Sequence, residues 1–543
     1  MTRRHIHTLI YFLSIGTIAV CMTMSVWACN LAWVVLLANW LVEWIWNDRE
    51  SRRKILSGFK TNRLLQAFVA LFLMYVVGLL WSSNWSYGLD SIRKCFPLIA
   101  IPMVLLTADP LNDERLPDFV LFGPFRKERS HRLVGNILFL YIMGILAASI
   151  VGLVRYFTID NLPYRDIIPF LSHIRFSLNL CMGITLLVWQ VVLGWRKSGF
   201  RWTSVVAIIL ALYFLFYLFL LQSYTGLIIL TMVGIVSFFA RWNAIQSKRL
   251  KRSILTLLIA GIVSIAGTSI YYVNDYYQLK DPSSQPLRLA TANGNPYQHL
   301  NDGLIENGNY VNNYLCDLEM EREWAKRSAL SIHDTTPNGY TLRPTLVRYL
   351  NAMGKTKDSL GMAYLTSQDV EAIEKGIANP VYLRPLSLKR MYSVMLYEYE
   401  SYRCYHAVKG FTMLQRFELW KNGFKVFTQH PLFGVGTGDV VDLCHQQLET
   451  DDSPLKGTTK HCHNQYLTYL ITFGLFGFAL ILFFFTRAFR KKRLFQHIPF
   501  LALMTIFLIS CLTEDTLETL AGIVFFVFFC SLFSQRYHFE PHN

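Results

Sequence analysis

The sequence predicts an all-α polytopic membrane protein with about twelve transmembrane helices. Of the 543 residues, 53% are hydrophobic and only 16% are charged, whereas a soluble domain usually carries about 25% charged residues. Apolar runs of roughly 16 to 22 residues recur, each long enough to cross a hydrocarbon core of about 30 Å. We place the spans at residues 8–24, 28–46, 64–81, 95–108, 133–154, 173–194, 203–222, 225–240, 253–273, 464–486, 498–512 and 519–534.

The basic residues orient these spans. If the N-terminus lies in the cytoplasm, the inner segments hold 27 Lys and Arg, whereas the short outer segments hold few, among them Arg93 and Arg165. Such an excess is typical of cytoplasmic loops, so we expect both termini on the cytoplasmic side. The net charge of +16 therefore faces membrane lipids, and nucleic acid is excluded as a partner.

One outer segment, residues 274–463, is far longer than the others. It separates a bundle of nine spans in residues 1–273 from the last three spans and a cytoplasmic tail in residues 464–543. Residues 277–312 are rich in Asn, Gly, Pro and Gln, which predicts irregular structure. Residues 387–428 carry apolar side chains at helical spacing, which predicts two helices or one kinked helix. The predicted fold is thus a membrane bundle with a large, mainly helical outer loop before the tenth span.

Acidic residues are almost absent from the predicted spans, and Glu43 lies near a cytoplasmic end. A secondary transporter normally keeps ionisable groups near the middle of the membrane for its coupling ion. This scarcity favours an enzyme over a transporter or flippase of lipid-linked sugars, which is the alternative of another class. The polar residues gather instead near the outer ends of the spans.

Three segments near the C-terminal end of the chain carry this polar chemistry. They read R-x-x-x-W followed by HPLFGVGTGD at 416–439, HCHNQYLTYLITFGLFGF at 461–478, and LTEDTLETLAGIVFFVFF at 512–529. Together they resemble the O-antigen ligase and O-antigen polymerase superfamily of bacterial envelope glycosyltransferases. The closest likeness is His463-Asn464, then nine residues, then Gly474 and Gly477.

The resemblance implies a multi-pass enzyme of the bacterial inner membrane with a periplasmic active site. It implies transfer of a glycan from an undecaprenyl diphosphate carrier, with no cofactor and no metal. O-antigen ligation to lipid A–core is the favoured reaction. Polymerisation of repeat units and O-glycosylation of protein are alternatives, because all three share these motifs. The expected partners are the lipid-linked glycan, lipid A–core or another glycan or protein acceptor, and membrane lipids.

Such a transfer needs a cation to hold the departing diphosphate and a base to take the acceptor hydroxyl's proton. Arginine suits the first task, because its planar fork matches phosphate oxygens and stays charged. Arg416 is the candidate, with pairing to Glu400 or Glu418 on a solvated helix face as the alternative. Histidine suits the second task, because its pKa lies near neutral. His463 is the candidate catalytic base, and His461 is its competitor.

Further residues are candidates for substrate binding. Arg175 lies at the outer end of the sixth span, where an arginine is costly without a partner such as a diphosphate; a phospholipid headgroup is the alternative. Asn464 and Trp420 belong to the motifs. Tyr224 stands where the resembled family often has arginine, so Arg175 or a loop arginine such as Arg403 is expected to replace that cation.

Two outer turns allow two interpretations each. The glycine-rich turn could bring backbone N–H groups at Gly436 and Gly438 towards phosphate, or its glycines could only permit a tight turn. The acids Glu514, Asp515 and Glu518 could anchor an arginine or orient the candidate base, or they could simply be solvated.

Four of the ten cysteines lie in the outer loop, where an oxidising environment permits disulfides. Cys444 with Cys462 is the simplest pair. Cys444, His445, His461 and Cys462 could instead form a zinc cluster, but their spacing fits no usual zinc pattern. The resembled family is also metal-independent, so no metal site is expected.

Overall fold

A computed structural model describes most of the chain, and its residues form two compact units. The described residues are 3–46, 49–108, 110–112, 129–159, 162–280, 287–300, 302–336, 339, 341–384, 387–458, 461–490 and 492–534. Residues 1–245 and 416–543 form the first unit, here called the bundle unit, and residues 246–415 form the second, the loop unit. Parts of the predicted inner segment 109–132 and of the tail lie outside the described residues.

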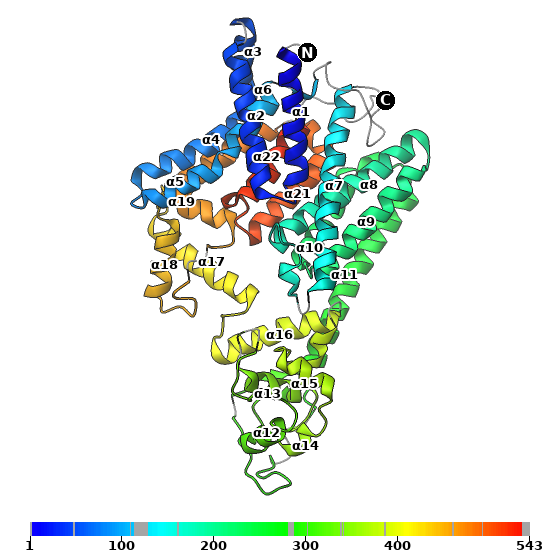
Figure 1. The fold of residues 1–543 in the computed structure, drawn as a ribbon, viewed down its shortest axis with the longest axis vertical. Coiled ribbons are helices and arrows are strands. Elements are labelled where there is room, and N and C mark those ends of the chain that lie inside the picture. Colours follow the sequence, from blue (N-terminus) through cyan, green and yellow to red (C-terminus); the bar gives the residue numbers. More distant parts are fainter. Residues whose placement is uncertain are drawn as a thin grey trace. The chain divides into compact units, whose positions relative to one another are not determined.

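The bundle unit is built almost wholly from helices (Figure 1). They are α1 (Arg3–Cys21), α2 (Val26–Trp46), α3 (Arg49–Thr61), α4 (Arg63–Gly78), α5 (Trp85–Cys95), α6 (Pro97–Thr107), α7 (Arg129–Thr158), α8 (His173–Ser198), α9 (Trp202–Leu220), α10 (Tyr224–Ala240), α17 (Thr412–Gln429), α18 (Val440–Thr450), α19 (Gln465–Phe489), α20 (Lys492–Phe495), α21 (Ile498–Thr513) and α22 (Leu520–Ser534). Short 3₁₀ turns join some of them: η1 (Leu79–Trp81), η2 (Pro110–Asn112), η3 (Tyr164–Asp166), η4 (Trp242–Ala244) and η6 (Thr516–Glu518).

The last helix, α22, forms the centre of this unit. Its side chains from Gly522 to Phe533 are buried, and it packs against α6 and α21. The rings of Phe507 and Phe526 stack with their centroids 3.7 Å apart. Helix α4 lies along α19, and α8 along α9 (Figure 1). A helix that is apolar on every face is suited to such a fully enclosed position.

The apolar helices confirm a mostly helical membrane protein. Within the described residues, seven helices are long and apolar enough to cross a membrane: Val26–Trp46, Arg63–Trp81, Leu133–Thr158, His173–Trp195, Trp202–Leu220, Lys248–Tyr277 and Gln465–Phe489. Four shorter apolar helices accompany them: His5–Cys21, Tyr224–Ala240, Ile498–Thr513 and Leu520–Ser534.

The predicted span 95–108 coincides with α6 to within two residues at each end, but this helix is short. The predicted span begins at the last residue of α5, and α6 starts at Pro97 and has only 11 residues. Proline fits the first helical turn, because it lacks the N–H that would be unbonded there. The count of twelve spans therefore stays a prediction.

Helix α19 is broken at Gly474, whose φ of 65° lies in the left-handed region. The glycine-rich turn enters this break and exchanges backbone hydrogen bonds with the helix. Leu475 donates its N–H to Pro431 at 2.8 Å, and Val435 donates to Ile471 at 2.8 Å. A Cβ at Gly474 would lie 2.3 Å from a backbone oxygen of the turn. The glycine is therefore required both by its φ and by the close approach of the two chains.

The loop unit has its own core. Its elements are α11 (Lys248–Tyr277), β1 (Ile305–Glu306), β2 (Asn309–Tyr310), α12 (Asp317–Trp324), α13 (Leu342–Ala352), α14 (Ser359–Met362), α15 (Ser367–Glu374), η5 (Pro380–Leu383) and α16 (Leu388–Tyr405). Strands β1 and β2 form an antiparallel hairpin. Trp324 and Tyr349 are fully buried, and the Arg348 guanidinium binds the buried Glu306 carboxylate at 2.9 Å.

The two units divide the chain differently from the predicted boundaries at 273 and 463. The segment 387–428 contains two helices, α16 and α17, separated where His406 takes a φ of 52°. Most of α17 belongs to the bundle unit. The reason is packing: Val426 of α17 and Cys444 of α18 share a small apolar core with Ile471 of α19.

Candidate functional site

Three of the predicted site residues converge on one acidic turn of the bundle unit. This turn, residues 514–518, lies between α21 and α22 and contains Glu514, Asp515 and Glu518. Its backbone and side chains bind Arg175 from α8, Arg416 from α17 and the segment just before α19. The arrangement brings together two cations and one histidine.

Arg416 is buried and is bound by the acidic turn. Its Nη2 donates to Glu514 Oε1 at 2.6 Å, and its Nε donates to the Thr513 carbonyl at 3.1 Å. Only 8% of the residue is exposed. A bond between two charged groups in such a setting is stronger than one between neutral groups, so it fixes one edge of the guanidinium.

The predicted alternative for Arg416 is wrong. Glu400 instead binds the guanidinium of Arg403, with a shortest distance of 2.6 Å. Glu418 accepts a hydrogen bond from Ser453 at 2.9 Å. Arg416 therefore does not lie on a solvated face with either acid, and Arg403 is already paired within the loop unit.

Arg175 lies in the first turn of α8, where Ser172 caps the helix by accepting from the Arg175 N–H at 3.3 Å. Its Nη2 donates to the Asp515 carbonyl at 3.0 Å. Its Nη1 is buried and has no hydrogen-bond partner among the residues that the structure describes. Leaving a buried donor unbonded is unfavourable, so this guanidinium edge is suited to an anionic ligand.

His463 directly precedes the cap of α19 in a left-handed conformation, with φ of 50°. Asp515 accepts from the His463 N–H at 2.8 Å, from the Asn464 N–H at 3.2 Å and from the Thr468 hydroxyl at 2.7 Å. The Asn464 side chain caps the helix by accepting from the Leu467 N–H at 3.1 Å. A positive φ is uncommon outside glycine, and these bonds hold the histidine backbone in it.

The side chain of His463 faces Glu514 and solvent. Its Nδ1 lies 3.8 Å from Glu514 Oε2, and 38% of the side chain is exposed. Burial raises the pKa of the Glu514 carboxyl. His463 and the guanidinium groups of Arg175 and Arg416 lower it by a larger amount, so the net pKa lies below its ordinary value. Glu514 is thus ionised near neutral pH and lies between a cation and the candidate base.

His461 belongs to a separate polar cluster. Its Nε2 lies 3.3 Å from the Tyr87 hydroxyl of α5. Nearby Glu518 accepts from the Tyr75 hydroxyl at 2.6 Å and from Gln465 Nε2 at 3.2 Å. Burial is the main cause that raises the pKa of the Glu518 carboxyl. His461 therefore interacts electrostatically with Glu518, whereas His463 lies beside Glu514.

The predicted glycines have their backbone donors engaged within the protein. Gly436 donates to the Thr472 carbonyl at 3.0 Å, and Gly438 donates to the Ser82 hydroxyl at 2.9 Å. Phosphate binding through these N–H groups would require those bonds to break. Trp420 packs against the small core formed by α17, α18 and α19. For all three residues, contact with a substrate stays a prediction.

Tyr224 is the first residue of α10, and 45% of it is exposed. Helix α10 packs against α8 and α21, the helices that carry Arg175 and the acidic turn. A substrate contact of Tyr224 also stays a prediction.

The two cysteines of the predicted pair are hydrogen-bonded to each other and are not covalently linked in the structure. Cys444 and Cys462 are buried free thiols, so the predicted disulfide is not present in the structure. The hydrogen bond to Cys444 and burial raise the pKa of the Cys462 thiol. His445 lies 3.6 Å from Glu449. Throughout the described ranges, no three His, Cys, Asp or Glu side chains are grouped to hold a metal ion, so the zinc alternative with His461 is not assembled.

Sequence reasoning missed the residues that support the acidic turn from within the helices. Gln465 accepts from the Leu517 N–H at 2.6 Å and donates to Glu518, and Tyr75 donates to the same carboxylate. The sequence contained a weak indication of Gln465 and Tyr75, because each is a polar side chain in the outer half of a predicted apolar span.

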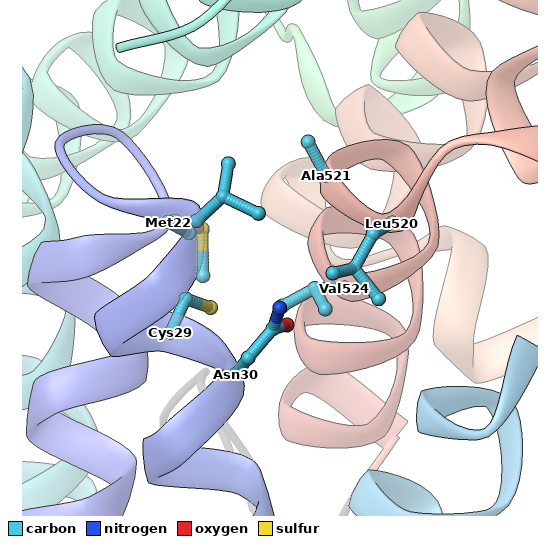
Figure 2. Close-up of a pocket in the computed structure, with 7 residues that line it drawn as sticks. Met22, Cys29, Asn30, Leu520, Ala521 and Val524 are labelled. Atoms are coloured by element: carbon cyan, nitrogen blue, oxygen red, sulfur yellow. The ribbon is translucent and has the colours of Figure 1, made fainter. Parts of the chain in front are cut away.

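A small pocket lies between the α1–α2 turn and the start of α22 (Figure 2). Met22, Cys29 and Val524 are among its lining residues, and its volume is about 10 Å³. Since a single water needs about this much room, the pocket is too small to bind a substrate.

Comparison with known proteins identifies one segment of the chain. No curated protein matches the chain. Residues 381–482 match the family model described as O-antigen ligase. The match includes Arg416, the glycine-rich turn and His463, whereas Arg175 and the acidic turn lie outside it. The match confirms the resemblance given by the sequence motifs: residues 381–482 carry the domain of the O-antigen ligase superfamily.

Proposed function

We propose that the protein transfers a glycan from an undecaprenyl diphosphate carrier to lipid A–core at the periplasmic face of the bacterial inner membrane. The observation that carries the proposal is the convergence of Arg175, Arg416 and His463 on the acidic turn. The family match supports a membrane glycosyltransferase. We also propose twelve spans with both termini in the cytoplasm, because Lys and Arg are concentrated in the predicted inner segments.

The two arginines hold the diphosphate. Arg175 offers its unbonded Nη1, and Arg416 is fixed by Glu514 so that the rest of its guanidinium can bind a second oxygen. Arginine recognises phosphate oxygens with paired, charge-assisted hydrogen bonds. These contacts strengthen as charge develops on the leaving diphosphate, so they lower the barrier to its departure.

His463 acts as the general base. The acceptor hydroxyl oxygen attacks the anomeric carbon of the glycan while the bond from that carbon to the diphosphate oxygen breaks. The hydroxyl proton passes to the imidazole, and the polyprenyl diphosphate leaves with the bonding electron pair. Ionised Glu514 stabilises the resulting imidazolium from 3.8 Å. Two arginines thus supply the positive charge that other phosphate chemistries take from a metal, so we expect activity to persist in EDTA.

Transfer by purified protein in detergent tests the proposal, with the His463→Ala and His461→Ala variants as a matched pair. Loss of a general base typically lowers the rate by about 10² to 10⁴, whereas His461→Ala should remain within a few-fold of wild type. Near-normal turnover by His463→Ala would refute the base assignment. Absence of any transfer by wild type would favour the transporter or flippase alternative.

Deletion of the gene, followed by analysis of envelope glycans, tests the acceptor. Loss of attachment with long chains intact indicates ligation to lipid A–core. Single repeats on the core indicate a polymerase, and loss of protein glycans indicates a protein O-oligosaccharyltransferase. Reporter fusions test the orientation: a fusion near residue 350 should be active only outside the cytoplasm, and one near residue 490 only inside.

A further inference from the structure

Helix α16 of the loop unit has the reverse of the usual polarity of a surface helix. One face carries a row of apolar and aromatic side chains, each between 41% and 54% exposed, here called the α16 stripe: Leu388, Met395, Tyr399 and Tyr402. At 3.6 residues per turn, these four positions lie within about 60° of one another around the helix axis. A helix on a water-facing surface normally exposes its polar residues and buries its apolar ones.

The opposite face of α16 is polar, and it is the face that packs onto the loop unit. Its buried residues are Ser393, Glu400 and Ser401. The Glu400 carboxylate accepts hydrogen bonds from the Tyr277 hydroxyl at 2.8 Å and from the Arg403 guanidinium at 2.6 Å. These bonds fix the rotation of α16 about its axis, so the stripe faces outward.

Further contacts join α16 to the end of α11 within the same unit. The hydroxyls of Ser269 and Tyr392 lie 2.6 Å apart, and the rings of Tyr272 and Tyr392 stack with their centroids 5.2 Å apart. Lys389 binds Asp275 at 2.8 Å. Helix α16 therefore runs across the last turns of α11 (Figure 1).

The level of this crossing in the membrane follows from the sequence of α11. The helix begins with the basic run KRLKR at residues 248–252, and it is long and apolar enough to cross a membrane. Basic residues concentrate at the cytoplasmic ends of spans. A hydrocarbon core takes about 20 helical residues, so a core that begins after this run ends near residue 272. This count puts the crossing at the outer membrane interface, the level at which tyrosine is enriched.

We propose that the α16 stripe binds the outer leaflet of the membrane, with α16 lying in the membrane plane. The partner is phospholipid. Leu388 and Met395 contact the acyl chains, and the two tyrosines keep their hydroxyls at the level of the headgroups. From Leu388 to Tyr402 the stripe is about 21 Å long, and it adjoins a helix that itself crosses the bilayer.

No charged residue belongs to the stripe, so its binding does not require anionic lipid. The segment predicted as an outer loop is then held on the membrane surface along this helix. The proposal is independent of the proposed glycan transfer, because it depends only on contacts within the loop unit and on the span α11.

Photo-crosslinking of the full-length protein tests this proposal. The photoreactive residue p-benzoylphenylalanine replaces Tyr399 or Tyr402, and the purified protein is placed in phosphatidylcholine nanodiscs, illuminated and analysed for lipid adducts by mass spectrometry. The positive control carries the same residue at Leu257, which is 71% exposed in α11. The negative control carries it at Tyr364, which is 60% exposed in the loop unit but lies outside α16. All four positions are on the surface, so the variants are expected to fold.

We expect lipid adducts at Tyr399, Tyr402 and Leu257, and none at Tyr364. A parallel sample with added maltoheptaose tests whether the exposed tyrosines bind sugar instead. Adducts with this oligosaccharide, or with a second copy of the chain, in place of lipid would overturn the proposal. It would also be overturned if both tyrosines gave no lipid adduct while Leu257 gave one, or if Tyr364 gave an equal yield.

A charge placed in the stripe gives a second test in the same nanodiscs. Met395→Asp should remove most of the lipid adduct formed at Tyr402, because a carboxylate in contact with lipid is costly. Leu360→Asp is the matched control, because Leu360 is also 51% exposed but lies on α14. It should leave the adduct at Tyr402 unchanged. Equal yields in the two variants would contradict the assignment of the stripe to lipid.

Discussion

Replacing Asp515 by Asn should test whether the proposed base, His463, depends on Asp515 for its position. Asp515 Oδ2 accepts the His463 N–H at 2.8 Å, while Oδ1 accepts from Asn464 and Thr468. The amide keeps one oxygen for the last two donors but turns an NH₂ group towards the His463 N–H. One bond to a charged acceptor is lost and one donor is left unbonded, which costs about 1–3 kcal/mol of stability. The left-handed backbone of His463 then loses its main support.

The expected effect on catalysis is larger than the effect on stability suggests. A shift of about 1 Å in a reacting group can lower the rate about a hundredfold, so kcat should fall by about that factor with little change in the KM for the donor. Melting temperature and steady-state transfer are measured on the same purified samples. Asp439→Asn is the control, because Asp439 also accepts two backbone N–H bonds, from Ser83 and Asn84. If Asp515→Asn and Asp439→Asn lose the same stability and both keep wild-type turnover, the positioning role of Asp515 is refuted.

Three further predictions follow from contacts elsewhere in the chain. Arg416→Lys should lower transfer at least about tenfold, because a point charge cannot keep two directed bonds and also bind phosphate; unchanged kinetics would contradict this. Gly474→Ala should destabilise the protein by at least about 2 kcal/mol through its positive φ and the close backbone oxygen. Gly234→Ala, with open space around it, should have little effect in the same thermal assay. Burial lowers the pKa of Lys357 to about 7 from 10.5. Between these values the unfolded chain binds the extra proton, so stability should rise with pH. Lys357→Met should remove that slope from melting temperatures measured between pH 7 and 10.

The membrane fold could be predicted because its signal is local. A long apolar run specifies a helix that fits the bilayer whatever its neighbours are, and most predicted spans are helices in the structure. The span predicted at 95–108 coincides with α6 to within two residues at each end, and Pro97 marks the first residue of that helix, since proline favours a helix start.

The partners of the site residues could not be predicted in the same way. Arg175 binds a carbonyl 340 positions later in the chain, and no local pattern specifies such a contact. Glu418 appeared a natural partner for Arg416 because it is near in sequence. Residues two apart on a helix point to different faces, so helix geometry already argued against that pair. Only the packing of α17 onto the turn after α21 revealed Glu514.

In the proposed reaction, the acidic turn would serve both halves of the transfer. Glu514 binds Arg416 and lies 3.8 Å from His463, so a single ionised carboxylate is shared by the proposed phosphate-binding cation and the proposed base. In the proposed reaction, a diphosphate bound to the other edge of the Arg416 guanidinium would weaken the attraction between Arg416 and Glu514. The carboxylate is then free to interact more strongly with His463 and to stabilise the imidazolium that forms as the acceptor loses its proton. Under the proposed function, donor binding and activation of the base would therefore be linked through one side chain. In this arrangement the base is most effective when the donor is already bound, which favours transfer to the acceptor over its premature deprotonation.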